Sequence, residues 1–250
     1  MSELKGKIAL ITGAARGIGK GIALVLAEKG ADIILNDKED SEALRETLEL
    51  LKSFNTNVFF KAADVSSEKE VAALFSFVKE NFGALDLLVN NAGTSQSKDI
   101  FETTLEDWEY ILKTNLTSCF LCSKYAMQVM KEQGGGKIIN LSSVVGQQGA
   151  LYGHTHYAAS KSAILGVTKT LARTGAPLGI RVNAIAPGII ETDLLRQTHG
   201  EEGIARIAED VPLGIGKPRD IGLAVAFLAG EGGDYITGTT LDVNGGLYFR

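Results

Sequence analysis

Residues 12–19 read Thr12-Gly13-Ala14-Ala15-Arg16-Gly17-Ile18-Gly19, and the prediction of the fold starts from this glycine-rich turn. The turn follows an apolar run over residues 7–11 and leads into a helical pattern over about residues 17–29. Clustered glycines between a strand and a helix leave backbone N–H groups and the positive end of the helix open to a phosphate. Tight strand-to-helix turns also use glycine for steric reasons, so the Gly-x-x-x-Gly-x-Gly spacing alone fits a purely structural turn as well.

Apolar runs and helical patterns alternate along the rest of the chain. The runs are continuously apolar, as strands buried on both faces should be, and cover residues 7–11, 32–36, 57–62, 86–90, 137–141, 181–185 and 240–243. The helical patterns cover about residues 17–29, 41–54, 68–82, 105–133, 157–174 and 219–228. This order predicts an α/β fold, a Rossmann-like doubly wound parallel sheet of about seven strands with helices on both faces. No linker interrupts the pattern, so we expect a single domain over residues 1–250.

The composition excludes several classes of protein. The 250 residues carry a formal net charge of −5, and phosphate neutralisation needs clustered Lys and Arg, so we expect no nucleic-acid partner. The apolar stretches fall short of the roughly 20 residues that span a bilayer, and the first residues lack the apolar region of a signal peptide. Cys119 and Cys122 lie inside one apolar helical pattern, where core packing explains them better than a redox pair. We therefore expect a cytoplasmic protein with no membrane partner.

Asp37 is a candidate for cofactor selection. It ends the second apolar run, and ligands of such sheets bind beyond the carboxyl ends of the strands. A carboxylate there accepts hydrogen bonds from the ribose hydroxyls of NAD and repels the 2′-phosphate of NADP by roughly 1–3 kcal/mol. We therefore expect NAD to be favoured over NADP, with Arg16 and Lys38 close enough in sequence to offset part of the repulsion. Taken alone, Asp37 also fits a solvated carboxylate that caps the next helix.

Tyr157 and Lys161 stand one turn apart on a helical pattern. A free phenol has a pKa of about 10 and is a poor base at neutral pH. Bringing the pKa near 7 takes roughly 4 kcal/mol, which an ammonium about 4 Å away supplies at most, at an effective dielectric of about 20. A positively charged nicotinamide ring would add to this stabilisation of the phenolate. The pair therefore predicts a general acid/base unit, although each residue on a helix more often serves packing or solvation.

Polar residues follow other apolar runs at the same predicted edge of the sheet. Ser142 and Ser143 end the fifth run, and a hydroxyl there can hydrogen-bond a substrate oxygen. The Ser-Val-Val-Gly context favours Ser143, with Ser142 as its rival. The remaining candidates are Asp64 and Val65 after the third run, Asn90-Asn91-Ala92-Gly93 after the fourth, and Asn115 in a helical pattern.

Together these motifs resemble the short-chain dehydrogenase/reductase family, in its subgroup of about 250 residues. The resemblance runs from Lys5 to the C-terminus and rests on residues 12–19, residues 90–93, Ser143, Tyr157-x-x-x-Lys161 and Pro187-Gly188, in the family's order. It implies that Tyr157 is the general acid/base, that Ser143 polarises the carbonyl, that Lys161 holds the nicotinamide ribose and that Asn115 positions a water in a proton relay. It implies no metal. The cofactor contacts that it implies are Gly13, Arg16, Gly17, Ile18, Gly19, Asp37, Asp64, Val65, Asn91, Ala92, Gly93, Tyr157, Lys161, Pro187, Gly188, Ile190 and Thr192.

The resemblance implies an oxidoreductase that moves hydride between NAD(P)(H) and a secondary alcohol or ketone. Within the family the chain is most similar to 3-oxoacyl-thioester (3-oxoacyl-ACP type) reductases and to NAD-dependent sugar or polyol dehydrogenases. Asp37 and the polar residues before Tyr157 favour NAD and a hydroxylated substrate, and both substrate classes remain open. A non-catalytic nicotinamide-binding sensor is the alternative from another class, and the intact Ser, Tyr, Lys and Asn set counts against it.

Residues 189–213 predict a substrate lid. The segment is long, contains Gly200 and Gly203, and lies between the sixth run and the last helical pattern. Lids that exclude water during hydride transfer are built this way. We expect Gln147, Gln148, Ala150 and Leu151 to form the facing wall.

His154 and His156 flank the approach to Tyr157, and the apolar tail over residues 241–250 carries Tyr248 and Phe249. The histidines fit a substrate contact, or a role in packing or at the helix start, better than metal, because no third ligand is near in sequence. Exposed aromatic ends are costly, so the tail predicts burial in a subunit interface. With the family resemblance it implies a homotetramer.

Overall fold

The computed structural model describes residues 3–150 and 153–250. Its strands are β1 Ile8–Thr12, β2 Asp32–Asp37, β3 Val58–Ala62, β4 Leu87–Asn90, β5 Gly136–Leu141, β6 Ile180–Pro187 and β7 Thr240–Val243. Its α-helices are α1 Gly17–Glu28, α2 Glu42–Leu51, α3 Glu68–Phe82, α4 Leu105–Leu112, α5 Ser118–Gln133, α6 Val145–Gln148, α7 Thr155–Gly175, α8 Asp193–Glu209 and α9 Pro218–Ala229. A π-helical turn, η1 Lys113–Thr117, joins α4 to α5, and short 3-10 turns form η2 Ala176–Leu178 and η3 Glu231–Gly233.

The strands pair in parallel in the order β3-β2-β1-β4-β5-β6-β7. The central strand β1 places Ile8 opposite Asp32 of β2 and Ala9 opposite Leu87 of β4. The strand order reverses between β1 and β4, so the segments that follow these two strands separate and leave a crevice. The predicted doubly wound α/β fold is confirmed.

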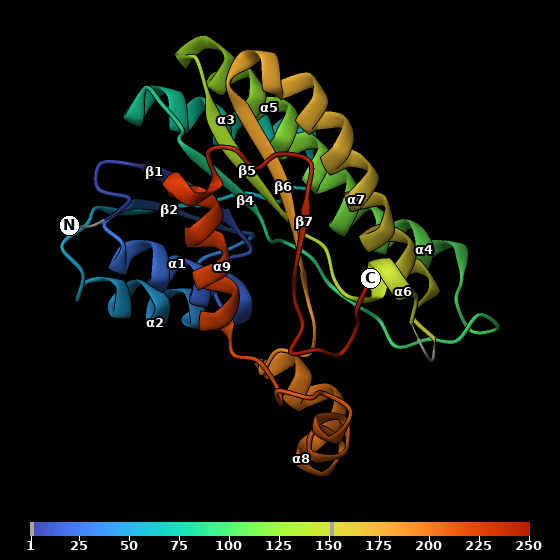
Figure 1. Cartoon of the computed structure of the whole chain (residues 1–250). Helices are drawn as coiled ribbons and strands as arrows, with labels where there is room; N and C mark the ends of the chain where they lie inside the picture. The colour runs from blue at the N-terminus through green and yellow to red at the C-terminus, as the bar shows by residue number, and fades with distance from the viewer. Residues whose placement is uncertain (1–2, 151–152) are drawn as a thin grey trace.

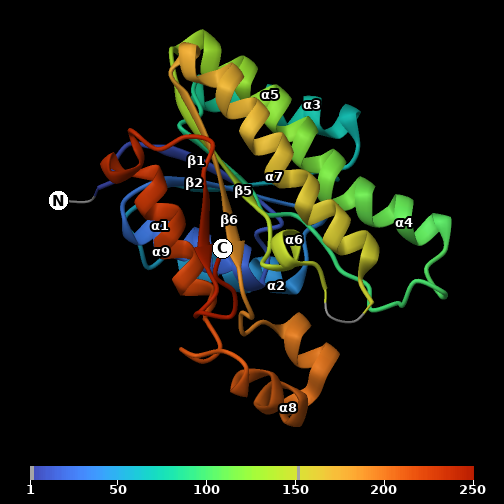
Figure 2. The ribbon, with the colours of Figure 1, turned by 45° about the vertical axis from the view of Figure 1, so that its right-hand side comes forward.

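Helices cover both faces of the sheet. Helices α1, α2 and α9 lie on one face, and α3, α5 and α7 lie on the other (Figures 1 and 2). Consecutive residues of β1 point to opposite faces, so Ile11 packs in the core under α1 and α9 while Leu10 packs in the core under α3 and α5. Two buried faces explain why the strands read as continuous apolar runs. Helix α8 projects beyond the carboxyl end of the sheet (Figure 1).

All the predicted strands are present, with ends shifted by at most two residues. The short helix α6 was not predicted, and two longer helical regions also differ from expectation. The pattern over residues 105–133 is not one helix, because η1 inserts an extra residue per turn and buries Asn115. The segment 189–213, to which the sequence assigned no helix, contains α8, which bends where Gly200 has a φ of 61°. One added residue in a turn does not disturb an apolar pattern enough to be seen in the sequence.

Cys119 and Cys122 are free and buried in α5. Burial raises the pKa of the Cys119 thiol to about 12. Core packing is therefore confirmed for this pair over a redox role. No helix within the described residues is long and apolar enough to cross a membrane.

The contact between α1 and α9 predicts a stability change. A Cβ on Gly21 would lie 2.4 Å from Cβ of Pro218, so we expect Gly21→Ala to lower the free energy of unfolding by about 1–3 kcal/mol. Gly166 of α7 has nothing within 4 Å of such a Cβ, and Gly166→Ala should instead raise stability by about 0.5–1 kcal/mol. Urea unfolding of both variants measures the two effects. If Gly21→Ala and wild type unfolded at the same urea concentration, α1 could move away from α9 without any loss of stability, and the prediction would be wrong.

Candidate active site

A cavity of about 480 Å³ opens at the carboxyl ends of the strands, where the strand order reverses. Most of the expected site residues line this cavity. Those that line it are Gly13, Arg16, Gly17, Ile18, Gly19, Asp37, Asp64, Val65, Asn91, Ala92, Gly93, Ser143, Tyr157, Lys161, Pro187, Gly188 and Thr192. Residues far apart in the chain thus meet where the topology predicts a ligand.

The glycine-rich turn forms one end of the cavity and is held by the segment after β4. Gly13 and Gly17 have φ values of 63° and 56°, and a Cβ on Gly13 would lie 2.9 Å from Cα of Ala92. Asn91 Nδ2 donates to the backbone carbonyls of Thr12 at 2.9 Å and Gly13 at 2.8 Å. Among the described residues, none caps the start of α1 with its side chain, and the first turn holds no acidic residue. This backbone cradle beside an uncapped helix end fits a dinucleotide pyrophosphate.

The Asp37 carboxylate is fixed against the glycine-rich turn. Its Oδ2 accepts a hydrogen bond from the backbone N–H of Ala15 at 3.0 Å, and its Oδ1 accepts one from the backbone N–H of Lys38 at 2.8 Å. The Lys38 ammonium lies 3.1 Å from Asp64. Burial acts to raise the pKa of Asp64, but hydrogen bonds from Ser66 and Lys38 outweigh it and hold that pKa below its usual value. The positive charge of Lys38 therefore offsets the negative charge of Asp64. The sequence analysis had expected it to offset part of the charge of Asp37.

Ser143, Tyr157 and Lys161 form another part of the wall. Lys161 is 5% exposed, and its ammonium donates to the carbonyl of Leu141 at 2.7 Å and lies 5.7 Å from the centroid of the Tyr157 ring. Ser143 Oγ accepts a hydrogen bond from the backbone N–H of Val145 at 3.3 Å and interacts with the Tyr157 hydroxyl. The i, i+4 spacing on α7 and the end of β5 thus bring the three groups together, as the sequence predicts.

Burial governs the protonation of this site. It raises the pKa of the Tyr157 phenol, and the hydrogen bond with Ser143 opposes that rise only in part. Burial also lowers the pKa of Lys161 to about 8, against a smaller raising effect of the nearby Cys119. The lowering that the sequence analysis expected from Lys161 is therefore outweighed by burial in this structure, and the effect of a charged nicotinamide stays a prediction. A site of low dielectric penalises the phenolate and the ammonium alike.

Asn115 holds the segments around the catalytic wall together. Its Oδ1 accepts from the backbone N–H of Thr94 at 2.8 Å, and its Nδ2 donates to the carbonyl of Thr94 at 2.9 Å and to Ser160 Oγ at 3.1 Å. These bonds join η1, the segment after β4 and α7. Asn115 is not among the described residues that line the cavity, and its relay role stays a prediction.

Ile190 lies behind the cavity wall, and Ser142 lines the cavity but uses its hydroxyl for a bond within the protein. Ile190 is 7% exposed, its side chain packs in the core under α1 and α9, and its backbone pairs with Gly216. The side chain therefore faces the apolar core, and the nicotinamide contact expected of Ile190 stays a prediction. Ser142 Oγ donates to the backbone carbonyl of Lys161 at 2.8 Å, which leaves Ser143 to face Tyr157 and removes Ser142 as its rival.

The wall predicted opposite the lid is not confirmed. Gln147 Nε2 donates to Asp242 at 2.7 Å, and Gln147, Gln148 and Ala150 are not among the described residues that line the cavity. Leu151 lies outside the described residues. From the lid segment, Thr192 and Asp193 at the start of α8 reach the cavity.

The cavity is also lined by residues that the sequence analysis did not single out: Asn36, Ala63, Ser66, Thr94, Ser95, Tyr110, Thr114, Leu141 and Asp193. Thr94 and Ser95 directly follow the motif at 90–93, so their place beyond the end of β4 was a usable signal. Tyr110 and Thr114 come from α4 and η1, and no local pattern marks a helix that folds back over a distant crevice.

The two histidines fasten the start of α7 to the segment after β4. His154 Nδ1 lies 3.2 Å from Ser95 Oγ, and His156 Nε2 lies 3.3 Å from Gln96 Oε1. His156 is fully buried, and burial lowers its pKa. Over the described residues, no group of three or more His, Cys, Asp or Glu side chains could hold a metal ion. The packing interpretation is thus confirmed for His156.

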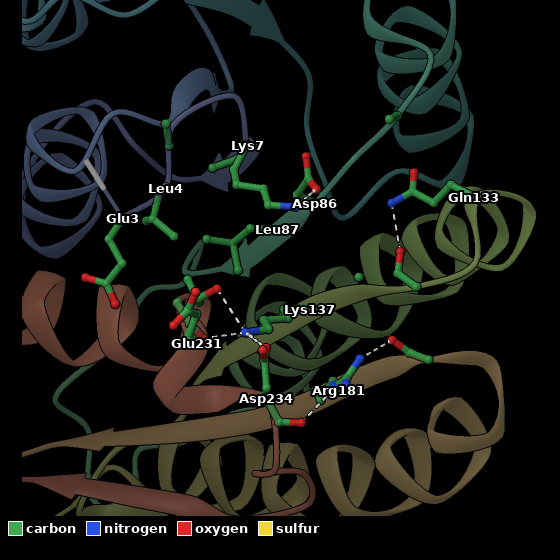
Figure 3. Close-up of a pocket in the computed structure, with 18 of the residues that line it drawn as sticks. Glu3, Leu4, Lys7, Asp86, Leu87, Gln133, Lys137, Arg181, Glu231 and Asp234 are labelled. Carbon is green, nitrogen blue, oxygen red and sulfur yellow. Dashed lines mark hydrogen bonds and ion pairs between the residues drawn. The ribbon is translucent and has the colours of Figure 1, made fainter. Parts of the chain in front are cut away.

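A second cavity, of about 580 Å³, lies at the other end of the sheet, beside the amino ends of the strands (Figure 3). Its cationic side chains are paired within the protein. Lys137 lies 2.7 Å from Asp234 and also donates to two carbonyls at the end of α9, while Lys7 lies 2.9 Å from Asp86. These pairs join the amino ends of strands to α9 and η3, so we interpret this cavity as structural.

Comparison with known proteins agrees with this geometry. The sequence model of one family, described as enoyl-(acyl carrier protein) reductase, matches residues 13–248. The chain is 43% identical over 247 residues to a 3-oxoacyl-[acyl-carrier-protein] reductase of Vibrio cholerae, covering 98% of this chain and 99% of the relative. It is 41% identical to the reductase of that description from Staphylococcus aureus, covering 97% and 98%. A short-chain type dehydrogenase/reductase from Mycobacterium marinum superposes with a TM-score of 0.94 at 32% identity, covering 100% of this chain and 98% of that one.

The lowered pKa of Lys161 predicts how stability depends on pH. The ammonium has a pKa of about 8 in the folded protein and about 10.4 when unfolded, so between these values the unfolded chain binds more protons. Stability then rises with pH by at most about 1.4 kcal/mol per pH unit. Urea unfolding of wild type and Lys161→Met should show a wild-type-minus-variant difference that increases from about pH 8 to about pH 10. A difference that is constant or falls would contradict the buried ammonium.

Proposed function

Because this chain belongs to the short-chain dehydrogenase/reductase family and is a nicotinamide-dependent oxidoreductase acting on CH–OH groups, we propose that it reduces 3-oxoacyl thioesters with NADH. One observation carries the proposal. A backbone cradle for a dinucleotide and the group of Ser143, Tyr157 and Lys161 line the same cavity. Such an arrangement supports hydride transfer coupled to proton transfer at one substrate carbon.

The protein's own groups move the proton. When bound, the nicotinamide supplies the hydride that reaches the carbonyl carbon. Ser143 donates a hydrogen bond to the substrate oxygen, and Tyr157 delivers its proton there as negative charge develops. Its raised pKa keeps the phenol protonated at neutral pH, the form that reduction consumes. Lys161, with a pKa of about 8, exchanges protons near neutral pH and is the next proton source, with Asn115 positioning the relay water.

Each part of the cavity has its own role in holding the cofactor. Gly13, Gly17 and Gly19 take the pyrophosphate, with α1 supplying N–H groups. Asp37 takes the adenosine ribose, and its fixed carboxylate together with the pairing of Lys38 to Asp64 supports NAD over NADP. The remaining contacts are Arg16, Ile18, Asp64, Val65, Asn91, Ala92 and Gly93 on the adenosine and phosphate side, and Tyr157, Lys161, Pro187, Gly188 and Thr192 on the nicotinamide side.

The relatives support the thioester substrate, since two curated 3-oxoacyl-[acyl-carrier-protein] reductases match nearly the whole chain. An NAD-dependent sugar or polyol dehydrogenase is the second candidate, favoured by Asp37 and by polar Ser95, which lines the same cavity as Tyr157. The intact Ser143, Tyr157 and Lys161 group argues against a sensor without turnover.

Assembly and closure complete the proposal. Exposed aromatic side chains, Phe249 at 82%, Phe101 at 94% and Tyr235 at 103%, support subunit interfaces in a homotetramer. Residues 189–213 act as the substrate lid, with α8 as its rigid part. A cytoplasmic location is part of this proposal and accords with the free thiols Cys119 and Cys122.

The acid/base role is tested by Tyr157→Phe. We expect this variant to bind NADH as wild type does and to lose turnover by several orders of magnitude, because the phenol proton is gone. Fluorescence titration measures NADH binding, and loss of NADH absorbance with a 3-oxoacyl thioester measures turnover. Tyr125→Phe, at a ring that stacks on Phe75 outside the cavity, is the matched control. Near-normal rates for Tyr157→Phe would refute the assignment.

The cofactor preference is tested by Asp37→Asn. This change removes the negative charge, so we expect the ratio of kcat/KM with NADPH to kcat/KM with NADH to rise roughly ten- to hundredfold. Asp40→Asn alters a carboxylate that pairs with Arg45 outside the cavity and should leave the ratio unchanged. If wild type already prefers NADPH, Asp37 does not select NAD.

The quaternary structure is tested by sedimentation. Four 26.5-kDa chains in one particle are expected across a dilution series, because the exposed aromatic side chains gain by burial. A stable monomer at every concentration would rule the interfaces out.

A further inference from the structure

Tyr110 brings to the cavity an aromatic ring that the proposed function does not use. It is 46% exposed and lines the cavity from α4. Within the described residues, its ring pairs with no other aromatic ring and its hydroxyl makes no hydrogen bond. A large side chain at the wall of a cavity, without a partner inside the protein, is well placed to contact a ligand.

Ile111 and Asn115 mark the buried face of α4 and η1. They are 0% and 1% exposed, and Asn115 Nδ2 donates to Ser160 of α7 at 3.1 Å. Tyr110 and Thr114 each precede one of them, so their side chains point about 100° away around the helix axis. Both line the cavity. They therefore form a part of its wall that is turned away from Ser160.

Helix α5 shows to which side this wall belongs. Tyr125 precedes the buried Ala126, as Tyr110 precedes its buried neighbour, and the Tyr125 ring stacks on Phe75 of α3 with 5.9 Å between centroids. Helix α3 begins directly after residues 64–66, which also line the cavity. The wall that contains Tyr110 thus lies on the side of α3, at the adenosine end of the proposed cofactor site.

This end of the cavity offers an adenine base little other surface on which to stack. Asp37 and Asp64 present carboxylates, and Val65 is 6% exposed because it packs in the core under α3 and α5. Bases stack on aromatic side chains, and replacing such a side chain by alanine weakens binding roughly ten- to hundredfold. Tyr110 supplies a ring of this kind without giving up a contact inside the protein.

We infer that the ring of Tyr110 stacks on the adenine of the bound dinucleotide and so sets part of the affinity for the cofactor. This inference rests on the proposed function, which places the adenosine at this end of the cavity. The ring makes the contact and the hydroxyl does not. Tyr110 is therefore a binding residue that takes no part in proton transfer or in holding the substrate.

Calorimetric titration with NADH and with ADP-ribose tests the inference, because ADP-ribose carries the adenosine and lacks the nicotinamide. The N-acetylcysteamine thioester of 3-oxobutanoate carries no adenine, and its KM at saturating NADH reports on the substrate end. The variants are Tyr110→Ala, which removes the ring, and Tyr110→Phe, which keeps it. Leu105→Ala removes an exposed apolar side chain from the same helix, outside the cavity, and is the control.

We expect Tyr110→Ala to raise the Kd of NADH and the Kd of ADP-ribose roughly tenfold or more. The KM for the thioester should not change, since the ring lies away from the substrate. Tyr110→Phe and Leu105→Ala should keep both Kd values within about twofold of wild type, because both retain the stacking ring.

Unchanged Kd values for Tyr110→Ala, or a rise in the thioester KM without a rise in the Kd of ADP-ribose, would overturn the inference. An equal loss of affinity in Tyr110→Phe or in Leu105→Ala would overturn it as well. If wild type binds neither NADH nor ADP-ribose, the proposed function fails together with the inference. If wild type binds both and leaves the thioester unreduced, the proposed substrate class fails, while the Kd values still decide the role of Tyr110.

Discussion

A buried ammonium beside a buried phenol is the constraint on which the site depends. Lys161 is 5% exposed and donates to the carbonyl of Leu141, and its charge lies 5.7 Å from the centroid of the Tyr157 ring. Burying a charge is costly unless hydrogen bonds compensate, and here the cost appears as a Lys161 pKa of about 8. The same burial raises the pKa of Tyr157. The site therefore holds a neutral acid until another charge enters it, which suits proton delivery during reduction.

The fold supplies this environment through connections between distant segments. The end of β5 gives the carbonyl that anchors Lys161, and α7 gives the helical spacing to Tyr157. The π-helical turn η1 carries Asn115 to the backbone of Thr94 and to Ser160, so the segment after β4 is fixed relative to α7. The reversal of strand order between β1 and β4 then places the glycine-rich turn in the same cavity.

The sequence predicts most of the framework because strands buried on both faces and clustered glycines leave strong local patterns. The parallel sheet, the cradle at Gly13 and the meeting of Ser143 with Tyr157 follow from such patterns and from the rule for parallel sheets. Burial of Ile190 behind the wall, the turn η1 and the left-handed His154 could not be predicted, because each depends on contacts between segments far apart in the chain. The protonation of Tyr157 was misjudged for a related reason. The i, i+4 spacing shows that the charge of Lys161 lies near Tyr157, but only the folded structure shows that the Tyr157 phenol is buried away from solvent.

The central claim is that burial keeps Tyr157 protonated until positive charge arrives beside it. Ultraviolet difference titration of wild type against Tyr157→Phe isolates the ionisation of this one phenol. Without cofactor, the titration should place its pKa above the usual value of about 10. With saturating NAD⁺, whose nicotinamide ring is positively charged, the same titration should show the pKa lowered by roughly two units or more. A Tyr157 pKa near or below 10 in the free protein, or one that NAD⁺ leaves unmoved, would contradict this account.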